Sequence, residues 1–274
     1  MTRRVTREAV QRAVAGVALV RRVYYFDELS STSDWARDLA IRSGPDADLH
    51  GTLIVAAHQT AGRGRHGRRW FAPPGTALLL TLMFDPARTA GGLPPDEAAG
   101  LVAMAGPVAV CEALAKAAGP AVNARIKWPN DVMLGGAKAA GLLIELSAVA
   151  RRFFINLGIG VNVNQPSDAF PPDLGQPAAS LLTATGRQHD PGSVLEAILK
   201  GLDRYLIPGE SARVAARMTL LCDTVGKTVE IRTADGWMTG TALAITDAGA
   251  LVVRDGTGRL FEIHSAEVRH CRPG

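Results

Sequence analysis

The 274-residue sequence contains little cysteine, few aromatic residues and only a small excess of charge. Its three cysteines, Cys111, Cys222 and Cys271, lie far apart and form no C-x-x-C pair, which indicates neither a disulfide framework nor a zinc site. Thiols of this kind are typical of reducing compartments, so we expect a cytoplasmic protein. Aromatic residues make up 5% of the chain, which argues against a basic nucleic-acid module that stacks bases on aromatic rings.

Long apolar runs are also missing from the pattern. Residues 13–20 are apolar but short, and Arg21 and Arg22 follow them, so we expect neither a signal peptide nor a membrane span. The formal net charge is +4, and much of the positive excess lies within residues 59–70. Such a local excess predicts a small anionic ligand as readily as a nucleic acid.

What the chain does contain is an arginine-glycine stretch at residues 59–70, QTAGRGRHGRRW. Its GRGRHG core has the spacing of a G-x-G-x-x-G dinucleotide fingerprint, which requires a helix directly after the glycines. Residues 71–75, FAPPG, cannot continue as a helix because they contain two prolines and a glycine. The planar guanidinium group of arginine binds carboxylate and phosphate oxygens. We therefore interpret the stretch as a flexible cationic loop that becomes ordered when an anion binds. A solvated basic loop is the alternative that this stretch leaves open.

Two further clusters combine lysine with turn residues. Residues 127–132, KWPNDV, place a lysine at the end of a predicted strand and Asn and Asp in the following turn. Residues 135–145, GGAKAAGLLIE, place Lys138 at the start of the return strand of a hairpin. Taken singly, these clusters also fit a plain Asn-Asp turn and a surface lysine on an edge strand.

The pattern of apolar residues predicts strands and helices in mixed order, followed by a small β module. Pro107 predicts a break or kink near Gly106 in the long helical stretch at residues 94–118. From about residue 227, short strands alternate with turns at residues 235–236, 248–249 and 255–256, as in a small barrel. We place the domain boundary between residues 222 and 223, with residues 1–20 as an N-terminal extension of the first domain. The remaining predicted helices are 5–20, 34–41, 193–207 and 212–220, and the predicted strands of the first domain are 23–26, 52–57, 77–84, 122–127, 132–134, 137–147 and 153–163.

Taken together, the sequence resembles the biotin protein ligases over about residues 22–270. The matching motifs occur in the family's order: SSTSD (30–34), QTAGRGRHGRRW (59–70), KWPNDV (127–132), AKAAGLLIE (137–145) and GIGVNVN (158–164). The resemblance implies an α+β fold, with a mixed β-sheet flanked by helices as in class II synthetases and a small C-terminal SH3-like β-barrel. It also implies an enzyme that uses ATP and Mg²⁺ to convert biotin to biotinyl-5′-AMP and then biotinylates a lysine of a biotin carboxyl carrier protein domain.

Regulatory members of this family carry an additional N-terminal domain that binds DNA. Only about twenty residues precede the matching region here, which is too short for a helix-turn-helix domain. We therefore expect the short form of the enzyme, without sequence-specific DNA binding. The sequence does not determine whether the protein is a monomer or a homodimer.

The resemblance also assigns roles to individual residues. The predicted catalytic side chains are Lys138, Arg65 and Lys127, because joining two anions calls for fixed cations more than for an acid or base. Magnesium is expected to be held by phosphate oxygens and water, with Asp131 as the candidate protein ligand. Ser33 stands where the family usually has asparagine. The biotin-binding set is Ser31, Thr32, Ser33, Gln59, Arg63, Gly64, Arg65, Lys138 and Gly141, and the ATP-binding set is Arg65, Arg68, Trp70, Lys127, Asn130, Asp131 and Asn162.

Two alternatives of related chemistry stay open at this point. A lipoate or octanoate protein ligase of the same superfamily would lack the KWPND motif and use a different arginine-glycine signature. A non-catalytic sensor of biotin or nucleotide would bind the small molecules without transferring biotin. An assay of biotin transfer to a carrier domain distinguishes both from the ligase.

Overall fold

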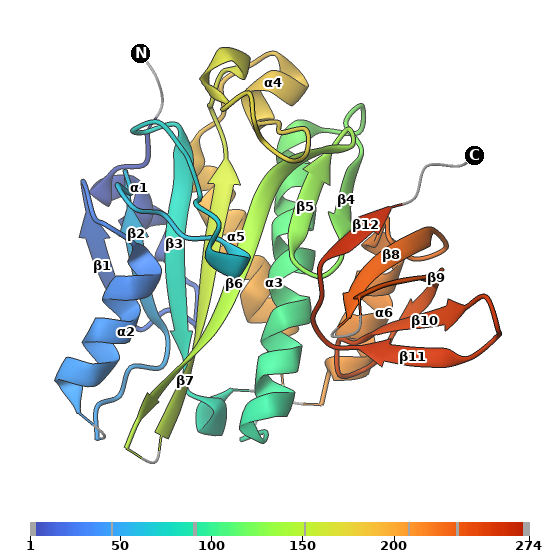
Figure 1. Ribbon diagram of the computed structural model, residues 1–274. Helices are drawn as coiled ribbons and strands as arrows, with labels where there is room; N and C mark the ends of the chain where they lie inside the picture. The colour runs from blue at the N-terminus through green and yellow to red at the C-terminus, as the bar shows by residue number, and fades with distance from the viewer. Residues whose placement is uncertain are drawn as a thin grey trace.

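The computed structural model describes residues 4–44, 46–89, 92–150, 152–207, 209–233 and 236–270. A seven-stranded sheet with helices on both faces forms the larger part, and a five-stranded sheet lies beside it (Figure 1). Cys271 and Asp235 of one predicted turn lie outside the described residues. The α+β fold with a small C-terminal β module is therefore confirmed, whereas the boundary between residues 222 and 223 stays a prediction.

The larger sheet is mixed, with the order β1-β2-β3-β7-β6-β5-β4. β1 runs parallel to β2, and the other neighbouring strands are antiparallel. A short connection at residues 135–136 links β5 to β6, as the hairpin motif predicts. The strands are β1 (Arg22–Phe26), β2 (Thr52–Ala56), β3 (Ala77–Phe84), β4 (Ala124–Lys127), β5 (Asp131–Leu134), β6 (Ala137–Val149) and β7 (Arg152–Asn162).

Successive side chains of β3 point to opposite faces of the sheet, and each face packs against different helices. Leu78, Leu80 and Leu82 belong to the large core beneath α3 and α5, whereas Met83 packs in a smaller core with Ala36 of α2. α1 and α6 pack on the same side as α3 and α5. One face of the sheet is thus closed by a helical layer, and the other leaves room beside α2. The helices are α1 (Arg7–Val14), α2 (Thr32–Ser43), α3 (Pro95–Ala118), α4 (Leu181–Thr185), α5 (Pro191–Tyr205) and α6 (Ser211–Leu221).

The α3 helix corrects two expectations. It runs without a break through Pro107, so the predicted break near Gly106 is wrong, whereas the alternative of a kink there stays a prediction. Tertiary packing holds this segment, because a Cβ added at Gly106 would lie 2.8 Å from Leu142 Cδ2 on the sheet. By length and composition α3 could also cross a membrane, contrary to our expectation that no apolar run is long enough. Its most apolar window is, however, 72% buried inside the fold, which is typical of a core helix.

The N-terminal and C-terminal segments differ in detail from the predicted pattern. The predicted helix at residues 5–20 is confined to α1, and α4 and β12 had no sequence signal. The smaller sheet is antiparallel, with the order β11-β10-β9-β8-β12. Its strands are β8 (Thr228–Thr233), β9 (Gly236–Ile245), β10 (Leu251–Asp255), β11 (Leu260–Ile263) and β12 (Val268–His270).

Hydrogen bonds join the segments next to the strands of the smaller sheet to β4 and to the turn that follows it. The Trp128 backbone N–H donates to Thr224 Oγ1 at 3.0 Å, and its indole N–H donates to the Gly249 carbonyl at 3.2 Å. The Asp223 N–H donates to the Ile126 carbonyl at 2.7 Å. Because these bonds anchor the KWPND turn, the C-terminal sheet lies against one wall of the site.

Candidate active site

A cavity of about 650 Å³ opens beside α2, on the face of the sheet that the helical layer leaves free. The arginine-glycine loop, residues 59–70, crosses in front of this face (Figure 1). Every predicted site residue lines the cavity, although their roles stay predictions. They are Ser31, Thr32, Ser33, Gln59, Arg63, Gly64, Arg65, Arg68, Trp70, Lys127, Asn130, Asp131, Lys138, Gly141 and Asn162.

Small hydroxyl and amide groups form the part of the cavity at the start of α2. Ser31 is the N-cap of the helix, and its Oγ accepts the Asp34 N–H at 3.3 Å. Gln59 Oε1 accepts from both the backbone N–H and the hydroxyl of Thr32, at 2.7 and 2.9 Å. These bonds orient the Gln59 amide and the N-terminus of α2, a setting that suits a compact uncharged polar group.

Ser33, which stands where the family usually has asparagine, contacts another hydroxyl group of the sheet. Its Oγ lies 3.2 Å from Thr81 Oγ1, which in turn donates to Thr32 Oγ1 at 2.9 Å. The space next to it is tight, since a Cβ added at Gly158 would lie 2.9 Å from Ser33 Oγ. The serine therefore closes a buried chain of hydroxyls, and Thr81 is a cavity neighbour that the motifs did not indicate.

Arg63 is already paired with two carboxylates. Its Nη1 lies 2.7 Å from Asp34 Oδ1 and its Nη2 lies 2.5 Å from Glu145 Oε1. Burial alone would lower the pKa of Arg63, but the hydrogen bonds and charges of Glu145 and Asp34 outweigh it and raise that pKa. In this arrangement Arg63 ties the arginine-glycine loop to α2 and β6. Sequence reasoning missed Glu145, which lies 82 residues away along the chain.

Arg65, in contrast, is held by neutral oxygens. Its Nη1 donates to Asn130 Oδ1 at 2.8 Å and its Nη2 donates to Ser265 Oγ at 2.7 Å. Burial lowers the pKa of this guanidinium. Arg68 Nη2 donates to Glu267 Oε1 at 3.1 Å, so the segment before β12 contacts the loop twice. Neutral partners leave the charge of Arg65 available for an anion, and the motifs did not indicate that the C-terminal sheet would supply contacts.

Two lysines and one aspartate lie on the opposite wall. Lys138 Nζ is 2.6 Å from Asp131 Oδ1, while Lys127 Nζ donates to Gln176 Oε1 at 3.2 Å. Burial lowers the pKa of Lys127, and the charge of Lys138 acts in the same direction. With Arg65, which is bound to the neighbouring Asn130, the cations outnumber Asp131, so this wall is suited to a ligand with several negative charges.

Trp70 covers two glycines of the sheet. A Cβ added at Gly141 would lie 2.9 Å from Trp70 Cζ3, and one at Gly160 would lie 2.6 Å from Trp70 Cε2. Lys138 Nζ lies 5.7 Å from the centroid of the indole ring. Within the described part of the chain, the buried Trp70 Nε1 has no hydrogen-bond partner. The glycines therefore create the space in which this ring forms the floor of the cavity.

We expect Gly160→Ala to lower the free energy of unfolding by about 1–3 kcal/mol, because the added methyl group overpacks against Trp70. Chemical denaturation followed by circular dichroism measures the change. Gly175→Ala is the matched control, since Gly175 also lines the cavity but has nothing within 4 Å of an added Cβ. Equal stabilities of the two variants would contradict the role assigned to Gly160.

The cavity offers few protein ligands for a metal ion. The described residues contain no group of three or more His, Cys, Asp or Glu side chains that could hold one. Asp131 supplies a carboxylate, and Asn162 Oδ1 is buried without a partner among the described residues. This donor set fits magnesium that is held largely by phosphate oxygens and water.

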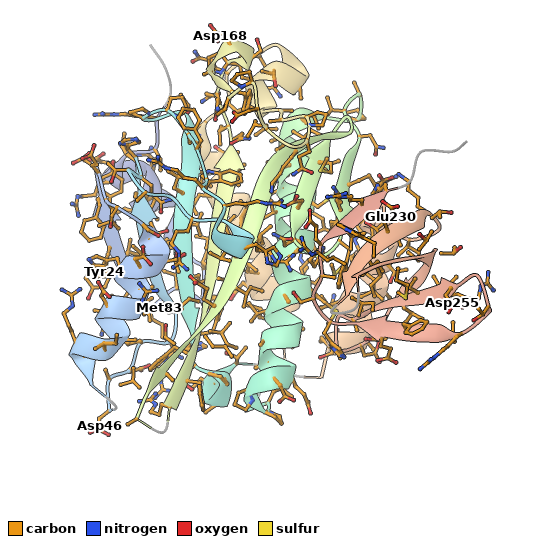
Figure 2. The ribbon with its side chains drawn as sticks, in the orientation of Figure 1. Tyr24, Asp46, Met83, Asp168, Glu230 and Asp255 are labelled. Carbon is orange, nitrogen blue, oxygen red and sulfur yellow. The ribbon has the colours of Figure 1, made fainter. Side chains whose placement is uncertain are left out.

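The segment between β7 and α4, residues 163–180, is a part of the site that the motifs did not reveal. Phe170, Leu174 and Gln176 of this segment line the cavity. Figure 2 shows Asp168 of the same segment at the upper end of the molecule. The segment pairs with the start of β6, because the Lys138 N–H donates to the Pro177 carbonyl at 2.8 Å. Such contacts leave no local pattern in the sequence.

Comparisons with known proteins found matches to both parts of the chain. Residues 31–162 match the biotin/lipoate A/B protein ligase family, and residues 224–270 match the biotin protein ligase C terminal domain. The chain is 35% identical to the bifunctional ligase/repressor BirA of Bacillus spizizenii over 253 residues, which cover 89% of this chain and 72% of the relative.

Two further matches, one relative and one solved structure, extend over nearly the whole length of both chains. The biotin–[acetyl-CoA-carboxylase] ligase of Mycobacterium tuberculosis is 32% identical, with 90% of this chain and 89% of that protein covered. The solved structure of the biotin protein ligase from Aquifex aeolicus in complex with biotin and ATP has a TM-score of 0.72 and 25% identity, covering 92% of this chain and 100% of that one. The chain therefore belongs to the biotin/lipoate A/B protein ligase family and, within it, to the biotin protein ligases.

Proposed function

We propose that this protein is a biotin–[biotin carboxyl carrier protein] ligase, which activates biotin with ATP and transfers it to a lysine. The observation that carries the proposal is a single cavity with uncharged polar side chains on one wall and positively charged side chains on the other. Uncharged polar groups surround the start of α2, and Lys127, Lys138 and Arg65 gather opposite them. The first wall suits the ureido ring of biotin, and the second suits a carboxylate next to a triphosphate.

In the first half-reaction, a biotin carboxylate oxygen attacks the α-phosphorus of ATP and pyrophosphate leaves. Both reactants are anions, so their repulsion and the charge that builds up at phosphorus have to be offset by fixed cations. Lys138 is the cation that we place beside the carboxylate, and Lys127 and Arg65 are placed at the phosphates. Magnesium, held by phosphate oxygens with Asp131 and Asn162 nearby, would neutralise further phosphate charge.

In the second half-reaction, the ε-amine of the acceptor lysine attacks the acyl carbon, the acyl–phosphate bond breaks and AMP leaves. Biotinyl-5′-AMP is a mixed anhydride that water can hydrolyse, so the arginine-glycine loop has to exclude water until the acceptor arrives. The contacts of Arg65 with Asn130 and Ser265 support a closed position of this loop.

The acceptor is proposed to be a biotin carboxyl carrier protein domain that adds a strand to β6. β5 pairs with β6 only as far as Gly141, so the outer edge of residues 143–149 has no partner among the described strands. Leu143 at the start of this edge lines the cavity. Exposed strand edges are common docking sites for another chain.

The proposal is tested with purified protein, biotin, ATP and magnesium. We expect pyrophosphate release and, once a carrier domain is added, biotin on the carrier that streptavidin detects. Omitting ATP should abolish transfer, and replacing biotin with lipoate should give little product. Absence of pyrophosphate release from the complete mixture would contradict the proposed ligase, and efficient lipoate transfer would favour the related lipoate ligases.

Two further features belong to the same proposal. We place the enzyme in the cytoplasm, because the described cysteines Cys111 and Cys222 are both free and buried. We also propose that the chain has no sequence-specific affinity for DNA. Gel-shift assays should therefore show only weak binding that falls steeply with salt.

A further inference from the structure

The amide of Gln176 bridges the two charged groups at the phosphate wall of the cavity. Its Oε1 accepts from Lys127 Nζ at 3.2 Å, and its Nε2 donates to Asp131 Oδ2 at 3.0 Å. Asp131 Oδ1 is bound in turn to Lys138 Nζ at 2.6 Å. Four side chains from β4, β5, β6 and the 163–180 segment thus form one chain of contacts.

The position of Gln176 is fixed by backbone pairing next to it. The Lys138 N–H donates to the Pro177 carbonyl at 2.8 Å, and the Ala179 N–H donates to the Lys138 carbonyl at 2.9 Å. These bonds tie the segment to the start of β6, directly beside the lysine that we place at the biotin carboxylate. The amide therefore enters the cavity from a fixed backbone rather than from a free loop.

Lys127 needs a neutral hydrogen-bond partner because it is partly buried and lies near the charges of Asp131 and Lys138. Burial lowers its pKa, the charge of Asp131 opposes this shift, and the charge of Lys138 adds to it. An ammonium beside Asp131 would form an ion pair with it if nothing stood between them. A neutral amide oxygen accepts a hydrogen bond more weakly than an anionic oxygen does, so a phosphate can displace it.

We propose that Gln176 is a positioning residue for the triphosphate. It keeps Lys127 directed into the cavity, separates it from Asp131, and gives way when a phosphate oxygen takes its place on the ammonium. This inference rests on the proposed use of ATP and deepens it, because it assigns the 163–180 segment to the recognition of phosphate.

The experiment compares ATP binding by the full-length wild type, Gln176→Glu and Gln176→Ala, using titration calorimetry. The glutamate is nearly isosteric, but its charge should hold Lys127 in an ion pair and repel Asp131, so we expect ATP affinity to fall by about tenfold or more. The alanine variant lets Lys127 approach Asp131, so its ATP affinity should fall by a smaller factor. Biotin affinity should stay unchanged in both variants, which a general loss of folding would not allow.

Ser167→Asp is the matched control, since Ser167 is exposed on the same segment outside the cavity lining and the change adds the same charge. We expect it to bind ATP as the wild type does. Wild-type ATP affinity in Gln176→Glu, or an equal loss of biotin and ATP affinity, would overturn the inference. Tighter ATP binding by Gln176→Ala would overturn it as well. Pyrophosphate release by the wild type tests the ligase proposal separately, because calorimetry needs no turnover.

Discussion

Lys138→Ala is expected to lower the rate of biotinyl-5′-AMP formation by about 10²–10³-fold, the usual cost of losing one fixed group that stabilises transition-state charge. Lys138 Nζ is held at 2.6 Å from Asp131 and 5.7 Å from the centre of the Trp70 ring, so its charge stands at a defined position in the cavity. Biotin-dependent exchange of labelled pyrophosphate into ATP measures the step without the acceptor.

The loss in Lys138→Ala should reflect the missing charge and not a damaged fold. Asp131 loses its ion pair with Lys138 in this variant but keeps its hydrogen bond from Gln176, so its side chain should stay in place. Lys200→Ala is the matched control, because Lys200 is an exposed lysine of α5 paired with Glu196 outside the cavity. Near-normal exchange by Lys138→Ala would remove Lys138 from the mechanism.

Arg65→Ala is expected to let biotinyl-5′-AMP escape or hydrolyse, in addition to slowing its formation. The change removes two hydrogen bonds that join the arginine-glycine loop to Asn130 and Ser265, along with the proposed phosphate contact. Each hydrogen bond from a charged group contributes about 1.5–3 kcal/mol, so with both bonds lost we expect biotinyl-5′-AMP to dissociate or hydrolyse at least about 100-fold faster.

Mass spectrometry of protein recovered after gel filtration measures how much intermediate stays bound to the Arg65 variant. Arg42→Ala is a suitable control, because Arg42 is exposed near the end of α2, outside the cavity lining, where its Nε donates to the Asp38 carbonyl. Retention equal to that of the wild type would contradict loop closure by Arg65.

Local sequence patterns predicted the elements that carry the site. The strand at β3 was predicted with its observed bounds, and the hairpin that presents Lys138 follows from the glycines at residues 135–136. Pattern reasoning predicted the long helix at α3, but it was wrong about a break at the proline and about the absence of an apolar run long enough to cross a membrane. At Pro107, burial of α3 between the sheet and α5 outweighed the local preference.

The motifs did not indicate which side chains pair with one another over long distances along the chain. Arg63 was predicted as a ligand for biotin, yet Asp34 and Glu145 already pair with it. Ser265, Glu267 and Gln176 contact motif residues from distant parts of the chain. Each of these contacts arises because sheet order brings separated segments together, and no spacing along the chain encodes it.

The sequence by itself determined which charged and glycine residues gather in motifs, and through them the kind of ligand: anions held by arginine and lysine. Only the tertiary structure decided which of those charges are neutralised inside the protein. Arg63 is paired with carboxylates, whereas Arg65 and Lys127 are bound to neutral oxygens. The reason is that the interaction of a charged side chain with a ligand depends on the neighbours of that side chain and on its burial. Packing of the folded chain determines both.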